Sequence, residues 1–81
     1  MYEPIGEKIA VVGAYSGGEF APKKFRWREQ LYPIQMITFV TDIRDGRTLK
    51  RRYSVTSGAQ AYRLLFDRIE ETWLLEELWV E

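Results

Sequence analysis

The chain of 81 residues contains no cysteine and no histidine. Without cysteine no disulfide can stabilise it, and the usual zinc sites of thiolates and imidazoles are excluded. The same absences exclude Ser-His and Cys-His nucleophilic catalysis. No apolar run approaches the ~20 residues of a membrane-spanning helix, and residues 1–10 lack the apolar core of a secretory signal. We therefore expect a cytoplasmic, non-catalytic protein that has no cofactor or metal and does not enter a membrane.

The core must come from the side chains that remain, and these are rich in aromatic rings, at 15% of the residues. Residues 1–81 make a single small domain. A chain of this size buries only about 60–65% of the surface that its unfolded form exposes. Small domains often gain further burial by association, so we expect a protein partner or self-association. The aromatic residues expected in the core are Trp27, Tyr32, Tyr53, Phe66 and Trp73.

The formal net charge of zero hides a division along the sequence. Residues 21–53 carry a net charge of +6, whereas residues 1–20 carry −2 and residues 54–81 carry −4. Local sign, more than net charge, decides which surface attracts an anionic partner. The middle of the chain is therefore the place to look for such a surface.

Turn-forming residues divide the chain into short runs of strand character. These runs cover residues 8–15, 23–29, 32–44 and 47–56. We predict an all-β fold, in the form of a small, strongly curled antiparallel sheet or a partly open barrel of five to six strands.

The pair Asp45-Gly46 between two of these runs predicts a two-residue type I′ hairpin. This turn would place Val40 opposite Arg51 on the core side and Phe39 opposite Arg52 on the other side. It would also place Arg44 opposite Arg47, and like charges directly opposite are unfavourable. A longer loop or a β-bulge would relieve that conflict.

Residues 60–80 allow two interpretations. Tyr62, Leu65, Phe66, Ile69 and Trp73 follow one helical face, and the residue types favour a helix. The same segment also alternates with the period of a strand. In that case a hairpin would turn around residues 67–72.

Three segments of the chain resemble a family of short bacterial domains. They are residues 22–28 (PKKFRWR) with 31–34 (LYPI), residues 52–55 (RYSV), and residues 62–67 (YRLLFD) with 73–76 (WLLE). The matching family patterns are F-x-W-R-G-R-x-Y-x-V, R-x-Y-x-V and Y-x-L-x-x-D…W-x-L-E. Two departures are Glu29, where the family often has glycine, and residues 38–44, which replace a tryptophan-rich segment.

The resemblance implies strands for residues 60–80. Domains of this family occur alone, or in and near proteins related to Y-family (lesion-bypass) DNA polymerases, and the resemblance implies the same setting for this chain. It brings no established activity and no catalytic residues. It is therefore compatible with an accessory role in DNA transactions.

The clearest candidate site is a row of basic residues on predicted strands. Alternate residues of a strand share one face and lie ~6.6–6.8 Å apart. Basic rows beside an exposed aromatic ring are typical of sheets that bind single-stranded nucleic acid. A solvated outer face that discourages edge pairing has the same pattern. The candidate residues are Lys24, Arg26, Arg28, Phe39, Lys50 and Arg52.

Two functions follow from these observations. The first is a non-catalytic protein-interaction or accessory module, which the zero net charge favours. The alternative is a nucleic-acid-binding module that uses the basic strand face.

Overall fold

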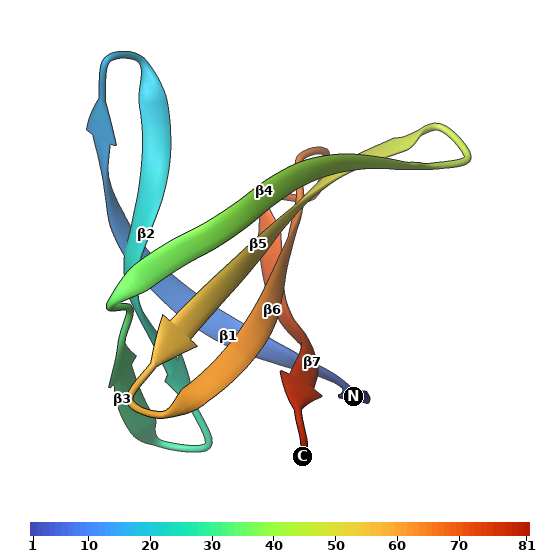
Figure 1. Cartoon of the computed structure of the whole chain (residues 1–81). Helices are drawn as coiled ribbons and strands as arrows, with labels where there is room; N and C mark the ends of the chain where they lie inside the picture. Colours follow the sequence, from blue (N-terminus) through green and yellow to red (C-terminus); the bar gives the residue numbers. More distant parts are fainter.

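The computed structural model describes all residues from 1 to 81 and contains no helix. Seven antiparallel strands form one strongly curled sheet in the order β3-β2-β1-β7-β6-β5-β4 (Figure 1). The all-β prediction is confirmed, and the sheet is not closed into a barrel. No segment forms a helix with the length and apolar character needed to cross a membrane. The strands are β1 (Tyr2–Ser16), β2 (Glu19–Trp27), β3 (Gln30–Pro33), β4 (Met36–Asp45), β5 (Thr48–Ser57), β6 (Gln60–Asp67) and β7 (Thr72–Trp79).

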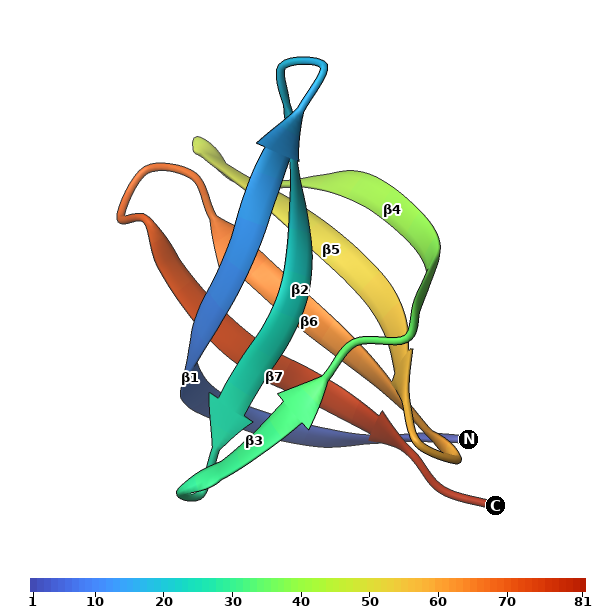
Figure 2. The same cartoon turned by 90° about the vertical axis from the view of Figure 1, so that its left-hand side faces the viewer.

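The seventh strand, one more than the sequence predicts, arises because residues 32–44 do not form one strand. They divide at Ile34 and Gln35 into the end of β3 and most of β4. This two-residue link joins the two ends of the sheet. The amide of Ile34 donates to Lys23 at 2.8 Å, and the amide of Gln35 donates to Thr56 at 2.9 Å. The link therefore ties the start of β4 to both β2 and β5 and holds the sheet in its curl (Figure 2).

β1 is long enough to belong to both halves of the sheet. Its first half pairs with β7 and its second half pairs with β2. Between Pro4 and Glu7 the pairing with β7 shifts, and Gly6 there has a φ of +70°. The turn-forming residues Pro4 and Gly6 thus lie at a bulge inside a strand, where the chain bends, and not at the end of a strand.

The turn between β2 and β3 consists of Arg28 and Glu29, with φ angles of 50° and 64°. A two-residue hairpin of this kind requires a positive φ at both positions, which glycine and asparagine adopt far more readily than other residues. Glu29 is therefore an unfavourable residue at a position whose positive φ favours glycine.

We predict that Glu29→Gly stabilises the protein. Relief of the left-handed conformation should raise the free energy of unfolding by about 1 kcal/mol, which corresponds to a midpoint increase of about 4–8 °C for a domain of this size. Thermal unfolding followed by circular dichroism measures the change. Glu29→Ala is the control, because alanine removes the charge and keeps the Cβ. Equal midpoints for the glycine and alanine variants would contradict the prediction.

The β4–β5 hairpin forms, but its turn lies one residue later than the sequence predicts. Gly46 and Arg47 are the turn, and Asp45 pairs with Thr48. Gly46 alone has a positive φ, of 62°, as a type II′ turn requires at its first central position. The predicted register is therefore wrong.

The observed register removes the conflict between Arg44 and Arg47, because Arg44 now lies opposite Leu49. Asp42 faces Arg51, and Val40 faces Tyr53. The shift moves each partner by two residues, so every side chain keeps the face predicted for it until a bulge between residues 37 and 39.

Residues 60–80 form the β6–β7 hairpin, as the strand interpretation and the family resemblance predict. Its turn covers residues 68–71. The side chain of Asp67 accepts hydrogen bonds from the amides of Ile69 and Glu70 at 2.9 and 3.1 Å. This carboxylate orders the four-residue loop, because it satisfies amides that have no strand partner.

The interior of the curled sheet holds a thin core. Its buried side chains are Phe25, Tyr53, Val55, Tyr62, Leu64 and Leu75. All five aromatic residues expected in the core are part of it. Tyr53 is buried, and the other four are partly buried and pack against the buried residues. The accessible surface is 5646 Å², against about 5,100 Å² expected for a compact chain of this mass. The chain therefore exposes somewhat more surface than a compact protein of the same mass.

Candidate functional site

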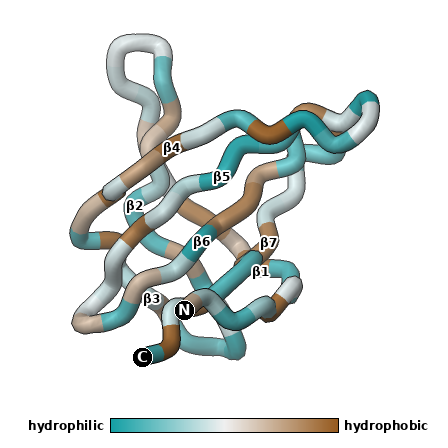
Figure 3. The backbone as a smooth tube through the Cα atoms, turned by 45° about the vertical axis from the view of Figure 1, so that its right-hand side comes forward, coloured by the Kyte–Doolittle hydropathy of each residue, from teal (hydrophilic) through white to brown (hydrophobic).

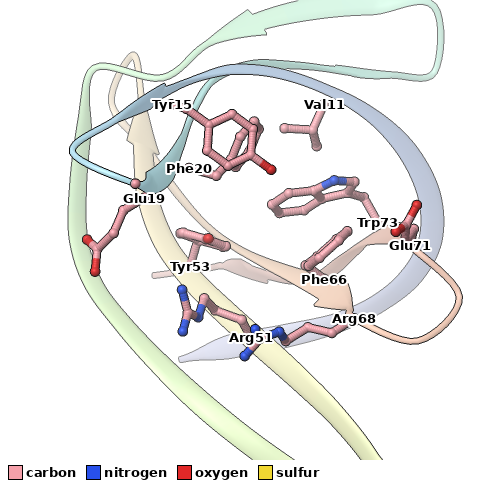
Figure 4. Close-up of a pocket in the computed structure, with 11 residues that line it drawn as sticks. Val11, Tyr15, Glu19, Phe20, Arg51, Tyr53, Phe66, Arg68, Glu71 and Trp73 are labelled. Atoms are coloured by element: carbon pink, nitrogen blue, oxygen red, sulfur yellow. The ribbon is translucent and has the colours of Figure 1, made fainter.

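The open part of the interior is a groove of about 640 Å³ on the concave side of the sheet. Figure 4 shows aromatic rings gathered around it, with charged groups at its margin. We call it the aromatic groove. Its rings are those of Tyr15, Phe20, Tyr53, Phe66 and Trp73, and its charged groups are Glu19, Arg51, Arg68 and Glu71.

The floor of the aromatic groove comes from three neighbouring strands. Phe66 and Trp73 are direct cross-strand partners on β6 and β7, with ring centroids 4.8 Å apart. Tyr53 on β5 lies 5.4 Å from Trp73. Alternate residues of each strand face the interior, so the pairing of these strands alone places the three rings together.

The rim of the groove comes from the β1–β2 hairpin. Tyr15 and Phe20 lie opposite each other on either side of a Gly17-Gly18 turn, with ring centroids 5.3 Å apart. Phe20 reaches the floor, 6.0 Å from Trp73. Tyr15 is 77% exposed, so its ring is available to a ligand. The hairpin thus extends the aromatic floor into a wall.

The charges at the groove margin are of two kinds. Arg51 forms a bidentate pair with Asp42, at 2.7 and 3.2 Å. The hydrogen bonds to Asp42 raise the pKa of Arg51, with a smaller contribution from Tyr53, and they lower the pKa of Asp42. Both groups therefore stay charged and paired at neutral pH. Arg68, in contrast, forms no ion pair and is free to meet an anionic group.

A second hollow, of about 250 Å³, adjoins the aromatic groove between β2 and β4. The two hollows share Glu19, Phe20, Arg51 and Tyr53. β4 is the last strand of the sheet, and β3 covers β2 only from Lys24 onward. Residues 19–20 of β2 and residues 40–42 of β4 line this hollow, and each of these segments has one strand edge without a partner strand. We call the opening between these two edges the wall slot.

The groove and the slot offer aromatic surface, one free guanidinium group and unpaired backbone hydrogen-bonding groups. No set of three or more Asp or Glu side chains gathers in a position to hold a metal ion. Such a site can bind a ligand by apolar contact and by backbone hydrogen bonds.

The basic residues predicted on β2 do not all lie on one face. Lys24 and Arg26 point outward on either side of buried Phe25, and neither forms an ion pair. Arg28 does not continue this row, because it lies in the turn after β2. Its guanidinium binds Glu7 at 2.7 and 3.2 Å.

The basic residues predicted on β5 are both paired. Lys50 lies 3.7 Å from the carboxylate of Asp45. Arg52 forms a half-buried bidentate pair with Glu76, at 2.7 and 2.8 Å. These contacts neutralise the two charges that the sequence prediction left free.

Phe39 lies on β4 and is 62% exposed, as the predicted stacking role requires. Its partner, however, is Ser54 and not Arg52, because the turn lies one residue later than predicted. In the sheet order, β1, β7 and β6 lie between β2 and β5. The six predicted residues therefore do not form one continuous strip. Lys24 and Arg26 remain as a free basic pair, with Phe39 on the opposite end strand of the sheet.

The acid dependence of stability provides a test of the Glu7 contacts. Arg28 first, and then the indole of Trp27 at 2.9 Å, lower the pKa of Glu7 by hydrogen bonding. A carboxyl whose pKa is lowered on folding stabilises the protein above its unfolded pKa, and this stabilisation is lost as the pH falls through its folded pKa. Glu7→Gln should therefore destabilise the protein at neutral pH, and the difference from wild type should narrow as the pH falls below about 4.3, the ordinary pKa of glutamate, and vanish once Glu7 is protonated.

Urea unfolding at a series of pH values measures this difference. Glu3→Gln, at an exposed position of the same strand, is the matched control and should leave the curve unchanged. A Glu7→Gln effect of equal size at all pH values would contradict the prediction. It would show that packing, and not the charge, carries the contribution.

The aromatic groove was not predicted from the sequence. The aromatic residues of β5, β6 and β7 were assigned to the core, which is correct, but Tyr53, Phe66 and Trp73 also line the groove. One signal was present: Tyr15 and Phe20 stand symmetrically about a Gly-Gly turn. Two aromatic residues so placed are cross-strand neighbours near a hairpin tip, where a small domain has no core to bury them.

Comparison with models of known protein families, with curated proteins and with solved structures finds no match to this chain.

Proposed function

We propose that this protein is a non-catalytic protein-interaction module that binds a segment of a partner protein in the aromatic groove. The observation that carries the proposal is the groove itself, in which five aromatic rings meet at an opening between two unpaired strand edges. Aromatic residues and arginine are the residue types enriched at the centres of protein interfaces. A groove of this composition gives a partner apolar contact together with backbone pairing.

The resemblance to domains that occur in or near Y-family polymerase-related proteins supports a more specific context. We propose that the module acts as an accessory in DNA transactions, where it holds a partner protein in place. In this role it needs no catalytic group of its own, in agreement with the lack of histidine and cysteine.

Affinity purification of the tagged protein from nuclease-treated cells tests this proposal. Proteins captured by the wild type should be lost with Tyr15→Ser/Arg68→Ser, because both side chains line the groove and neither belongs to the core. Lys24→Ser/Arg26→Ser is the matched control, because it changes two exposed side chains on the outer face. Partners that survive the groove variant and vanish with the control variant would overturn the proposal.

A second candidate function is nucleic-acid binding by the outer face. It is favoured by Lys24 and Arg26, which are exposed and unpaired, and by the exposed ring of Phe39. It is weakened by the ion pairs of Lys50 and Arg52. Two free cations give only a shallow salt dependence, because each neutralised phosphate contributes about one unit of slope.

Fluorescence anisotropy with labelled single- and double-stranded oligonucleotides, at about 50 mM and about 200 mM salt, decides between the candidates. The protein-interaction proposal predicts no saturable binding at either salt concentration. Micromolar binding that weakens at the higher salt and disappears with Lys24→Glu/Arg26→Glu would establish the nucleic-acid function instead.

A further inference from the structure

The free edge of β4 differs between its two halves. The second half carries Asp42, Arg44 and Asp45, and charges of this kind normally protect an edge strand from pairing with another chain. Residues 36–41 (MITFVT) carry no charge, glycine or proline. They expose apolar side chains on both faces: Phe39 is 62% exposed on the outside, and Val40 is 43% exposed on the inside. In Figure 3 this half of β4 is largely brown, whereas the tip of the β4–β5 hairpin is largely teal.

The wall slot begins where the uncharged half of β4 ends. Val40, Thr41 and Asp42 line one side of the slot, and Glu19 and Phe20 line the other. The β1–β2 hairpin rises beside this part of β4 (Figure 2). A folded domain that paired its own edge with β4 would bring further strands against β2. A single extended segment adds only one strand, at the ~4.8 Å spacing of a sheet.

We propose that the wall slot takes one extended segment of a partner protein, which pairs antiparallel with β4 as an eighth strand and inserts a large apolar side chain into the aromatic groove. The inference rests on the proposed function and specifies how the partner binds. Main-chain hydrogen bonds with β4 supply affinity, and alternate side chains of the segment supply specificity.

The register of the floor residues defines what the segment must carry. Val40 lies on the inner face opposite Tyr53, and Phe20 lines the other side of the slot, so a residue added beside Val40 on the inner face lies between Val40 and Phe20, at the rim of the aromatic groove. An aromatic or large aliphatic side chain at this position fills the groove and covers the rings that the core leaves open.

The next inner-face position of the segment lies beside Asp42, two residues from the position beside Val40. The charged groups around it determine which residue type it prefers. Asp42 lies among Arg51 and Arg68, and Arg68 lowers the pKa of Asp42 through space. Asp42 and Arg51 neutralise each other, so Arg68 is the unpaired charge on this side of the slot and favours an acidic residue, whereas Glu19 on the opposite side of the slot opposes it. In a segment antiparallel to β4, the position beside Asp42 precedes the position beside Val40. The segment therefore has the pattern acidic-x-apolar, read from its amino-terminal end.

Nuclear magnetic resonance with a synthetic peptide tests the inference. The probe is acetyl-Ser-Thr-Asp-Thr-Phe-Thr-Thr-Ser-amide, and the control peptides carry Lys in place of Asp, or exchange Asp and Phe. We expect the probe to bind with a Kd on the order of 0.1 mM, and both controls to bind about three- to fivefold more weakly. Alternate amides of residues 36–41 should gain protection from hydrogen exchange, and the resonances of Tyr15 and Trp73 should shift.

Arg68→Ala should remove the preference for Asp over Lys, whereas Arg47→Ala, a matched change in the exposed β4–β5 turn, should not. Binding that shifts the aromatic resonances without protecting the β4 amides would overturn strand addition and leave the proposed function standing. A lack of binding at about 2 mM peptide would also overturn the inference. The proposed function would fall with it only if the groove variant retained its captured partners in the affinity purification.

Discussion

Phe25→Ala is expected to lower the free energy of unfolding by about 3–5 kcal/mol. Phe25 is fully buried, with its ring stacked on Tyr32 at 5.1 Å and set edge-on to Tyr62 at 5.2 Å. It joins β2 and β3 to the strands on the other side of the curled sheet. A domain of this size has a total stability of only about 4–12 kcal/mol, so the variant should lose about a quarter of it or more, and at the lower end of that range it should be largely unfolded at room temperature. Urea denaturation followed by circular dichroism measures the loss.

Phe39→Ala is the matched control, because it makes the same chemical change at a side chain that is 62% exposed. The expected change in the free energy of unfolding is within about 0.5 kcal/mol. Similar losses for the two variants would contradict the assignment of the core, since they would mean that the outer face of β4 is as well packed as the interior.

Gly13→Ala is expected to cost about 2–3 kcal/mol and to disturb the rim of the aromatic groove. A Cβ at this position would lie closer than 3.0 Å to the carbonyl oxygen of Ala21 and to the ring of Phe20. The φ of Gly13 is not in the left-handed region, so the requirement for glycine is one of space alone. Phe20 packs across the bare backbone of β1, where the β1–β2 pairing shifts between Val12 and Gly13.

Two measurements separate the consequences of this substitution. Unfolding in urea gives the loss of stability, and Trp73 fluorescence reports the displacement of Phe20, whose ring lies 6.0 Å from the indole. The double variant Gly13→Ala/Phe20→Ala should lose less stability than the sum of the two single losses, because the clash with the ring is gone and only the clash with the carbonyl oxygen of Ala21 remains. Strict additivity would show that Phe20 does not pack over Gly13.

The strand content could be predicted from the sequence because it depends on local patterns. Alternation and turn residues place the strands of residues 8–15 and 47–56 to within a few residues, apart from the extension of β1 toward the amino terminus. The hairpin of residues 60–80 was undecided by periodicity, because the same apolar residues fit both periods. Pairing with β1 and β5 decides it, since a strand here completes the hydrogen bonds of two neighbours.

The β4–β5 register shows how a local rule can miss by one residue. Asp45-Gly46 is a strong type I′ signal, and it predicts both residues within the turn. The observed turn instead places glycine first, which brings Asp42 opposite Arg51 and Arg44 opposite Leu49. The ion pair and the absence of like charges across the strands favour this register. The sequence contained that information in the spacing of its charges, but the turn rule alone did not use it.

The candidate basic site shows a different limit. Alternation correctly places Lys24 and Arg26 on one face of β2, because a strand's faces follow from the chain alone. It could not show that Glu76 would neutralise Arg52, because Glu76 is 24 residues away in sequence and meets Arg52 across the sheet. Long-range ion pairs depend on strand order, which no local pattern contains.

The sequence by itself determined that this protein is a small all-β domain with an aromatic core, because alternation, turn residues and composition act over a few neighbouring positions. Tertiary structure decided the order of the strands, the incomplete closure between β2 and β4, and the groove that results. These features depend on how far the sheet curls before the link at residues 34–35 joins its two ends. That curvature is a sum over all seven strands, and the aromatic rings that local patterns assign to a core become a binding surface only where the curl leaves them open.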